Sequence, residues 1–172
     1  MKTGPLSIFA IHIRPNRWRG DKTMRFMMLM IPEVYQGSKG RSAAADFTPS
    51  PEAVQKMTRY NERLAKAGAL IGLDGLHPPE KGARVSFRGG KAQVTDGPFA
   101  ESKEVLGGYW LIRANSRQEA VEWARQVPAE DGDVVEIRQV FDDSDFPEET
   151  RKAAESKTVQ AALDQQARPA SK

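Results

Sequence analysis

The chain has 172 residues, a length that suits one domain with a core of its own, and it contains no cysteine. The absence of cysteine excludes disulfides, thiolate nucleophiles and cysteine-ligated metals, and it fits a reducing, cytoplasmic compartment. No apolar run approaches the roughly 20 residues that a membrane-crossing helix requires, so we expect neither a membrane protein nor a disulfide-stapled secreted one.

The formal net charge of +3 is distributed unevenly. Residues 1–23 carry five cations and one aspartate, which gives them a charge of +4 and leaves −1 on the remainder. They show neither helical nor strand periodicity, so we expect a disordered basic arm; alternatively, translation starts at Met24 and the arm is an over-extended start. Because the rest of the chain is nearly neutral, nucleic-acid binding by the arm is the weakest of our functional hypotheses.

The first predicted βαβ unit begins at Met24. Residues 25–31 form a strand-like apolar run, and a loop follows over residues 32–49. Ser50 is an N-cap and Pro51 a first-turn proline for an amphipathic helix that ends at Gly68. Residues 70–73 then form a short second strand, and the chain turns over residues 75–79.

A β-hairpin and a second βαβ unit follow. Residues 83–88 and 91–95 flank the pair Gly89 and Gly90, and two glycines can adopt the positive φ that a two-residue hairpin turn demands. A strand is predicted over residues 106–114, a helix from a capping box at Ser116 and Glu119 as far as Pro128, and a last strand over residues 134–141.

This order of elements predicts an α+β fold. It is the split βαβ arrangement of ferredoxin-like domains, with an antiparallel sheet, two helices on one face and an inserted hairpin. We expect residues 24–141 to form this domain. Residues 142–172 are poor in large aliphatic side chains, so we expect a loosely docked tail that is helical from about residue 147 to 162.

Two strands predict a homodimer. Residues 26–31 and 109–112 are apolar on both faces, which is typical of strands that are covered on both sides. In the ferredoxin-like order these two strands are central, and the two helices cover one face only. We expect a second copy of the sheet to cover the other face, because two-fold dimers dominate among soluble oligomers; the alternative is that the hairpin or the tail folds over it.

A specific resemblance lies in the sixteen residues from Val94 to Tyr109, which contain the run Asp96-Gly97-Pro98-Phe99. This segment resembles the signature of DGPF-motif proteins within the YCII-related family, and the similarity extends from about residue 24 to residue 141. The resemblance implies a ferredoxin-like fold and a dimeric α/β barrel but no settled reaction. Some relatives have a proposed catalytic histidine and aspartate; aligned on Gly68, the place of the histidine falls at Met57, which cannot transfer a proton. The resemblance therefore does not carry this pair over.

Two interpretations of the segment around Asp96 stay open. As a structural turn, it only links the hairpin to a central strand, with the aspartate accepting a downstream N–H and the proline fixing φ. As a site, it places Asp96 as a general base or ligand anchor at a sheet end near the dimer cleft, with Glu101 and Lys103 in support. The ligand-contacting residues would then be Gly97, Pro98, Phe99, His77, Arg84, Gly107, Gly108 and Tyr109.

Several of these residues also have plain structural interpretations. Gly107 and Gly108 indicate either a close approach or a bulge. Arg84 either pairs with an anionic substrate or solubilises a strand. His77 lies in a turn without a second histidine nearby for zinc, so we predict no metal site and no cofactor.

The leading hypothesis is a homodimer that binds a small polar metabolite in a cleft near the Asp96 turn, and acid–base chemistry at this cleft is an extension of that hypothesis. The alternative is a non-catalytic regulatory module, because the proteins it resembles accompany transcription control of the sigma-factor type.

Overall fold

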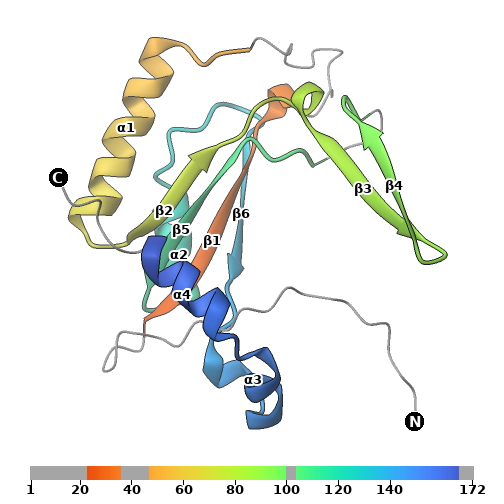
Figure 1. The fold of residues 1–172 in the computed structure, drawn as a ribbon. Helices are drawn as coiled ribbons and strands as arrows, with labels where there is room; N and C mark the ends of the chain where they lie inside the picture. The colour runs from red at the N-terminus through yellow and green to blue at the C-terminus, as the bar shows by residue number, and fades with distance from the viewer. Residues whose placement is uncertain (1–22, 36–46, 100–103, 167–172) are drawn as a thin grey trace. The chain divides into compact units, whose positions relative to one another are not determined.

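The structure is a computed structural model that describes residues 23–35, 47–99 and 104–166 of the chain (Figure 1). Thr23–Val140 form one compact unit, and the residues from Phe141 onward belong to a second. The expected basic arm lies outside the described residues, apart from Thr23.

The first unit has an α+β architecture. Its strands and helices are β1 (Met24–Ile31), α1 (Pro51–Lys66), β2 (Leu70–Gly75), β3 (Ala83–Arg88), β4 (Lys91–Asp96), β5 (Gly108–Ala114), α2 (Arg117–Ala124) and β6 (Val134–Gln139). Two short 3₁₀ helices, η1 (Glu33–Tyr35) and η2 (Pro79–Lys81), lie in the connections. Every helix and strand predicted for this part of the chain is present, with ends that shift by a few residues.

Local sequence signals explain where these elements begin and end. The Ser50 side chain accepts a hydrogen bond from the Ala53 N–H at 3.2 Å, as expected of an N-cap. At the start of α2, Ser116 accepts from the Glu119 N–H at 3.1 Å. The Glu119 carboxylate accepts a hydrogen bond from the Asn115 N–H at 2.8 Å. In a standard capping box the donor would be the N–H of the next residue, Ser116.

Four strands form one antiparallel sheet in the order β2-β5-β1-β6. The predicted central pair, β1 and β5, is therefore central. β3 and β4 form a separate two-stranded sheet, the predicted hairpin, around Gly89 and Gly90, whose φ angles are 57° and 75°.

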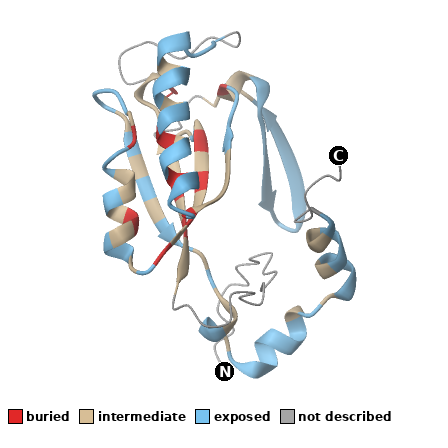
Figure 2. Ribbon diagram, turned by 90° about the vertical axis from the view of Figure 1, so that its left-hand side faces the viewer, coloured by how far each residue is buried: buried red, intermediate tan, exposed pale blue. Residues whose placement is uncertain are grey.

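One face of the main sheet carries the core. Phe26 and Met28 of β1 and Trp110 and Ile112 of β5 pack there against α1, which contributes Tyr60 and Leu64, and against Ala120 of α2. The rings of Tyr60 and Trp110 meet edge to face with centroids 5.8 Å apart. Both predicted helices thus share one face, and Figure 2 shows the buried residues gathered on these elements.

The opposite face of the main sheet, which we call the open face, is apolar at its centre. Met27 lies opposite Leu111 and Leu29 lies opposite Tyr109 in the β1–β5 register, and all four are partly buried. Glu136 and Arg138 flank them on β6. Within residues 23–140, α1 and α2 both pack on the other face, as the sequence predicted.

The second unit differs from the prediction. Instead of one helix over residues 147–162, the chain forms η3 (Asp143–Asp145), α3 (Glu148–Ala154) and α4 (Lys157–Gln166). Glu155 is extended, with ψ 123°, and Ser156 restarts the helix by accepting from the Val159 N–H at 3.3 Å. In the part of the chain that the structure describes, no helix has the length and apolar character to cross a membrane.

Candidate functional site

The segment around Asp96 packs directly against η2. The Gly97 N–H donates to the Gly82 carbonyl at 2.9 Å, and the Gly97–Pro98 peptide bond is cis. A Cβ on Gly97 would lie 1.8 Å from the Pro79 carbonyl oxygen, so only glycine fits. Asp96 itself is the last residue of β4 and is exposed.

Arg84 and Phe99, both predicted to contact a ligand, also contact each other. The Arg84 guanidinium carbon lies 4.0 Å from the centroid of the Phe99 ring, which is a cation–π distance. This contact joins β3 to the segment that follows β4. It fixes the base of the hairpin and orients the guanidinium over an aromatic face.

Gly107 and Gly108, at the start of β5, mark close approaches rather than a bulge. A Cβ on Gly107 would lie 2.4 Å from the Pro32 Cγ, and one on Gly108 would lie 2.8 Å from the Asp74 carbonyl oxygen. The irregularity in the sheet is instead in β2, between Leu70 and Gly72. Both glycines therefore allow neighbouring segments to pack closely at this end of the sheet.

Tyr109 donates a hydrogen bond to a carboxylate at the same end. Its hydroxyl lies 2.7 Å from Asp74 Oδ2, and the two residues are cross-strand partners in the β2–β5 register. This hydrogen bond, together with the negative charge of Asp74, raises the pKa of Tyr109 above its ordinary value. At neutral pH Tyr109 is therefore a protonated donor that holds the Asp74 carboxylate in place.

A second tyrosine and carboxylate lie close by. Tyr35 is only 9% exposed, and its hydroxyl donates to the Leu76 carbonyl at 3.3 Å. Burial, and then the charge of Glu80, raise the pKa of Tyr35. The Oε2 atom of Glu80 is buried and has no hydrogen-bond partner among the described residues. A buried acceptor without a partner costs about 1–3 kcal/mol, which a donor at this position would recover.

Backbone contacts tie the two pairs together. The Leu76 N–H donates to the Gly107 carbonyl at 2.9 Å, and a Cβ on Gly107 would lie 3.2 Å from the Tyr35 ring. We call Tyr35, Asp74, Glu80 and Tyr109 the sheet-end cluster. It combines two hydroxyl groups that stay protonated with two carboxyl groups, a combination that recognises polar groups through hydrogen bonds.

The sequence interpretation missed three members of the cluster, Tyr35, Asp74 and Glu80. The available signal was Asp74, an acid at the end of a short strand next to a turn. Nothing local connects Tyr35 to Glu80, because they are 45 positions apart in the sequence.

The remaining predicted residues contribute less to the site. His77 is exposed between β2 and η2. Glu101 and Lys103 lie outside the described residues, so their support of Asp96 stays a prediction. Within residues 23–35, 47–99 and 104–166, no group of three histidine, aspartate or glutamate side chains could hold a metal ion.

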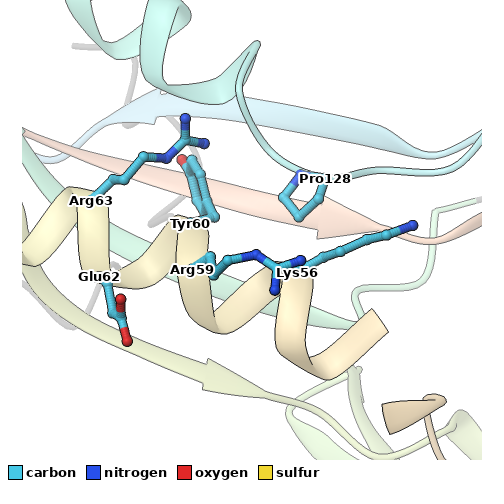
Figure 3. Close-up of a pocket in the computed structure, with 6 residues that line it drawn as sticks. All are labelled: Lys56, Arg59, Tyr60, Glu62, Arg63 and Pro128. Atoms are coloured by element: carbon cyan, nitrogen blue, oxygen red, sulfur yellow. The ribbon is translucent and has the colours of Figure 1, made fainter. Parts of the chain in front are cut away.

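A separate groove of about 460 Å³ lies on α1, and none of the predicted site residues line it. Figure 3 shows Lys56, Arg59 and Arg63 on the side of Tyr60 and Pro128, whereas Glu62 points away from Pro128. Arg63 also donates to the Gln126 carbonyl at 3.3 Å. The groove is cationic, but long basic side chains along an exposed helix commonly serve only to keep that face solvated.

Comparisons with known proteins identify a family and a relative for this chain. The family model of the YCII-related domain matches residues 24–144. An uncharacterised protein of Rhizobium meliloti (strain 1021) is 34% identical over 74 residues, which are 43% of this chain and 60% of that protein. The match therefore spans less than two thirds of the relative.

Proposed function

Because this chain belongs to the YCII-related family, we propose that it is a ferredoxin-like protein of the DGPF-motif subgroup whose homodimer binds a small polar metabolite at the sheet-end cluster. The relative from Rhizobium is itself uncharacterised and brings no activity. The proposal therefore depends on the chemistry of the cluster.

The observation that carries this proposal is the buried Glu80 oxygen beside Tyr35. Proteins rarely bury a carboxylate oxygen without a hydrogen-bond donor, because no interaction then offsets the free energy lost on removing the oxygen from water. A ligand with an N–H or O–H group would offset this desolvation by donating a hydrogen bond to the oxygen. The Tyr109 hydroxyl and the Asp74 carboxylate at the same sheet end offer further polar contacts. An amine or a polyol fits this pattern better than an anion, because both acidic groups would repel a negative charge.

The open face supports the homodimer in this proposal. Its apolar centre, Met27, Leu29 and Leu111, needs a cover, and a second open face packed against it would produce the dimeric α/β barrel. Tyr109 lies in the same row of the sheet as Leu29. Dimerisation would therefore bring the partner close to the Tyr109 hydroxyl and enclose the cluster.

The exposure of Asp96 favours binding over catalysis. A general base is most effective in a site that shields it from bulk water, whereas Asp96 is exposed at the end of β4. The non-catalytic regulatory module is therefore the second candidate, and acid–base chemistry by Asp96, with Glu101 or Lys103, is the more demanding hypothesis.

A thermal-shift screen of small amines, amino acids and polyols tests the proposal. Compounds that stabilise the wild type should stabilise Glu80→Gln and Asp74→Asn much less, because each variant changes one carboxylate acceptor to an amide. Glu104→Gln, which changes an exposed carboxylate outside the cluster, serves as the matched control. A compound at 100 times its dissociation constant adds about 2.7 kcal/mol of stability, so the loss is measurable.

Two outcomes would count against the proposal. If no compound of these classes stabilises the wild type, or if Glu80→Gln and Asp74→Asn respond like Glu104→Gln, the cluster is not a binding site. Asp96→Ala addresses the catalytic hypothesis separately. If the ligand still binds to this variant, Asp96 has no role in binding. A turnover assay that compares Asp96→Ala with the wild type then decides whether Asp96 acts as a general base.

A further inference from the structure

The hairpin has two chemically different faces. In the β3–β4 register, Val85 lies opposite Val94 and Phe87 lies opposite Ala92. Because side chains alternate along a strand, these residues share one side of the hairpin. We call it the apolar hairpin face; the other side carries Arg84, Ser86, Arg88, Lys91, Gln93 and Thr95.

The apolar hairpin face is exposed. Phe87 is 77% exposed, Val94 67% and Val85 53%. Figure 2 shows both strands exposed along their length, and in the described part of the chain β3 and β4 pair only with each other. An isolated two-stranded hairpin is marginal in water, and a large exposed aromatic residue beside two valines marks a surface that packs against something.

We propose that the apolar hairpin face packs against a second copy of this chain, so that each protomer clasps its partner with its hairpin. This inference rests on the proposed homodimer and extends its interface beyond the open face. Phe87 is the anchor of the contact, since aromatic side chains dominate the energetics of protein interfaces.

The area of the open face supports the choice of a second copy. Four strands about 4.8 Å apart, each about seven residues long at about 3.3 Å per residue, present a flat area of roughly 400 Å². A stable interface buries about 800 Å² on each partner. The hairpin adds roughly 200 Å² of flat area by the same geometry, which raises the total from about half to about three quarters of that value.

The charges on the hairpin argue against a nucleic acid as the occupant. Arg84, Arg88 and Lys91 all lie on the face opposite Phe87, and Asp96 shares the side of Val94. Phosphates would approach the cationic side and leave the apolar hairpin face in water. In a dimer the opposite holds, because the apolar face is buried and the cations stay solvated, where they also discourage edge-to-edge aggregation.

Sedimentation equilibrium of the full chain tests the inference through Phe87→Ser, with Gln93→Ser on the opposite face of the hairpin as the matched control. We expect Phe87→Ser to raise the dimer dissociation constant at least about tenfold and Gln93→Ser to leave it unchanged. Val94→Ser is the second variant, and circular dichroism checks that each variant is folded. Amide exchange should also show residues 83–88 and 91–96 losing protection when the wild type is diluted into monomers.

The outcomes separate this inference from the proposed function. A wild type that is monomeric at every concentration overturns both the dimer and the clasp. A wild type that dimerises with the same affinity as Phe87→Ser and Val94→Ser overturns the clasp alone and leaves the open-face dimer standing. A protection pattern that does not respond to dilution likewise overturns it, because the hairpin is then not covered by the partner.

Discussion

At the scale of single residues, Gly97 gives the sharpest steric prediction. Gly97→Ala places a methyl group where the Pro79 carbonyl lies 1.8 Å away, so either the turn or η2 must move. We expect a loss of about 1–3 kcal/mol in the free energy of unfolding, the usual cost of overpacking. Urea denaturation followed by tryptophan fluorescence measures it. Gly75→Ala is the control, since nothing lies within 4 Å of the added Cβ; equal stability of the two variants would contradict the prediction.

The sequence pointed to this glycine, but it could not assemble the cluster beside it. Gly97 stood out because glycine and proline in a turn have local conformational consequences. The charge of Glu80 acts on Tyr35 because η2 packs on the turn while η1 approaches Gly107. Such contacts depend on tertiary packing, and no short-range pattern encodes them.

At the scale of elements, one hydrogen bond connects α1 to the end of α2. The Tyr60 hydroxyl donates to the Trp123 carbonyl at 3.0 Å, and Tyr60 is 1% exposed. We expect Tyr60→Phe to lower the free energy of unfolding at pH 8 by about 1 kcal/mol, because it leaves the carbonyl without this donor.

The same variant should change the response to alkaline pH. Burial raises the pKa of Tyr60 to about 12, whereas a tyrosine in the unfolded chain ionises near the ordinary pKa of 10.0. The protonated form contributes its full stability below pH 10, and this contribution is lost as the pH rises from 10 to 12, since the unfolded chain loses the proton first. The advantage of the wild type over Tyr60→Phe should therefore shrink across this range, as measured by urea denaturation at pH 8, 10 and 11. A constant difference would contradict the assignment.

The ends of helices and strands were predictable where the residue at the end specifies a local backbone geometry. Ser50, Gly68 and the pair Gly89 and Gly90 each specify a local backbone geometry, and the structure has it at all of these positions. The tail was not divided correctly, because the break at Glu155 follows no glycine or proline. Ser156 was the overlooked signal, since it caps α4.

At the scale of the whole molecule, strand composition predicted which strands are central. β1 and β5 are apolar on both faces and occupy the two inner positions, whereas β6, with Glu136 and Arg138 on the open face, lies at an edge. Because β1 and β5 are apolar on both faces, three of their apolar residues, Met27, Leu29 and Leu111, face away from both helices of the first unit. We propose that a second copy of the chain covers them.

The substitution Leu111→Lys tests whether a second copy of the chain covers the open face. Leu111 lies between Met27 and Gly72 across the open face, so in a two-fold dimer the change would bury two ammonium groups, one from each copy. We expect the wild type to sediment at twice the chain mass of 19.1 kDa and the variant at 19.1 kDa, with unchanged circular dichroism because Leu111 is only partly buried. Val54→Lys, at a position on α1 that is 51% exposed, should remain dimeric. A Leu111→Lys protein that still sediments as a dimer would mean that the two sheets do not meet through their open faces, whatever the hairpin does.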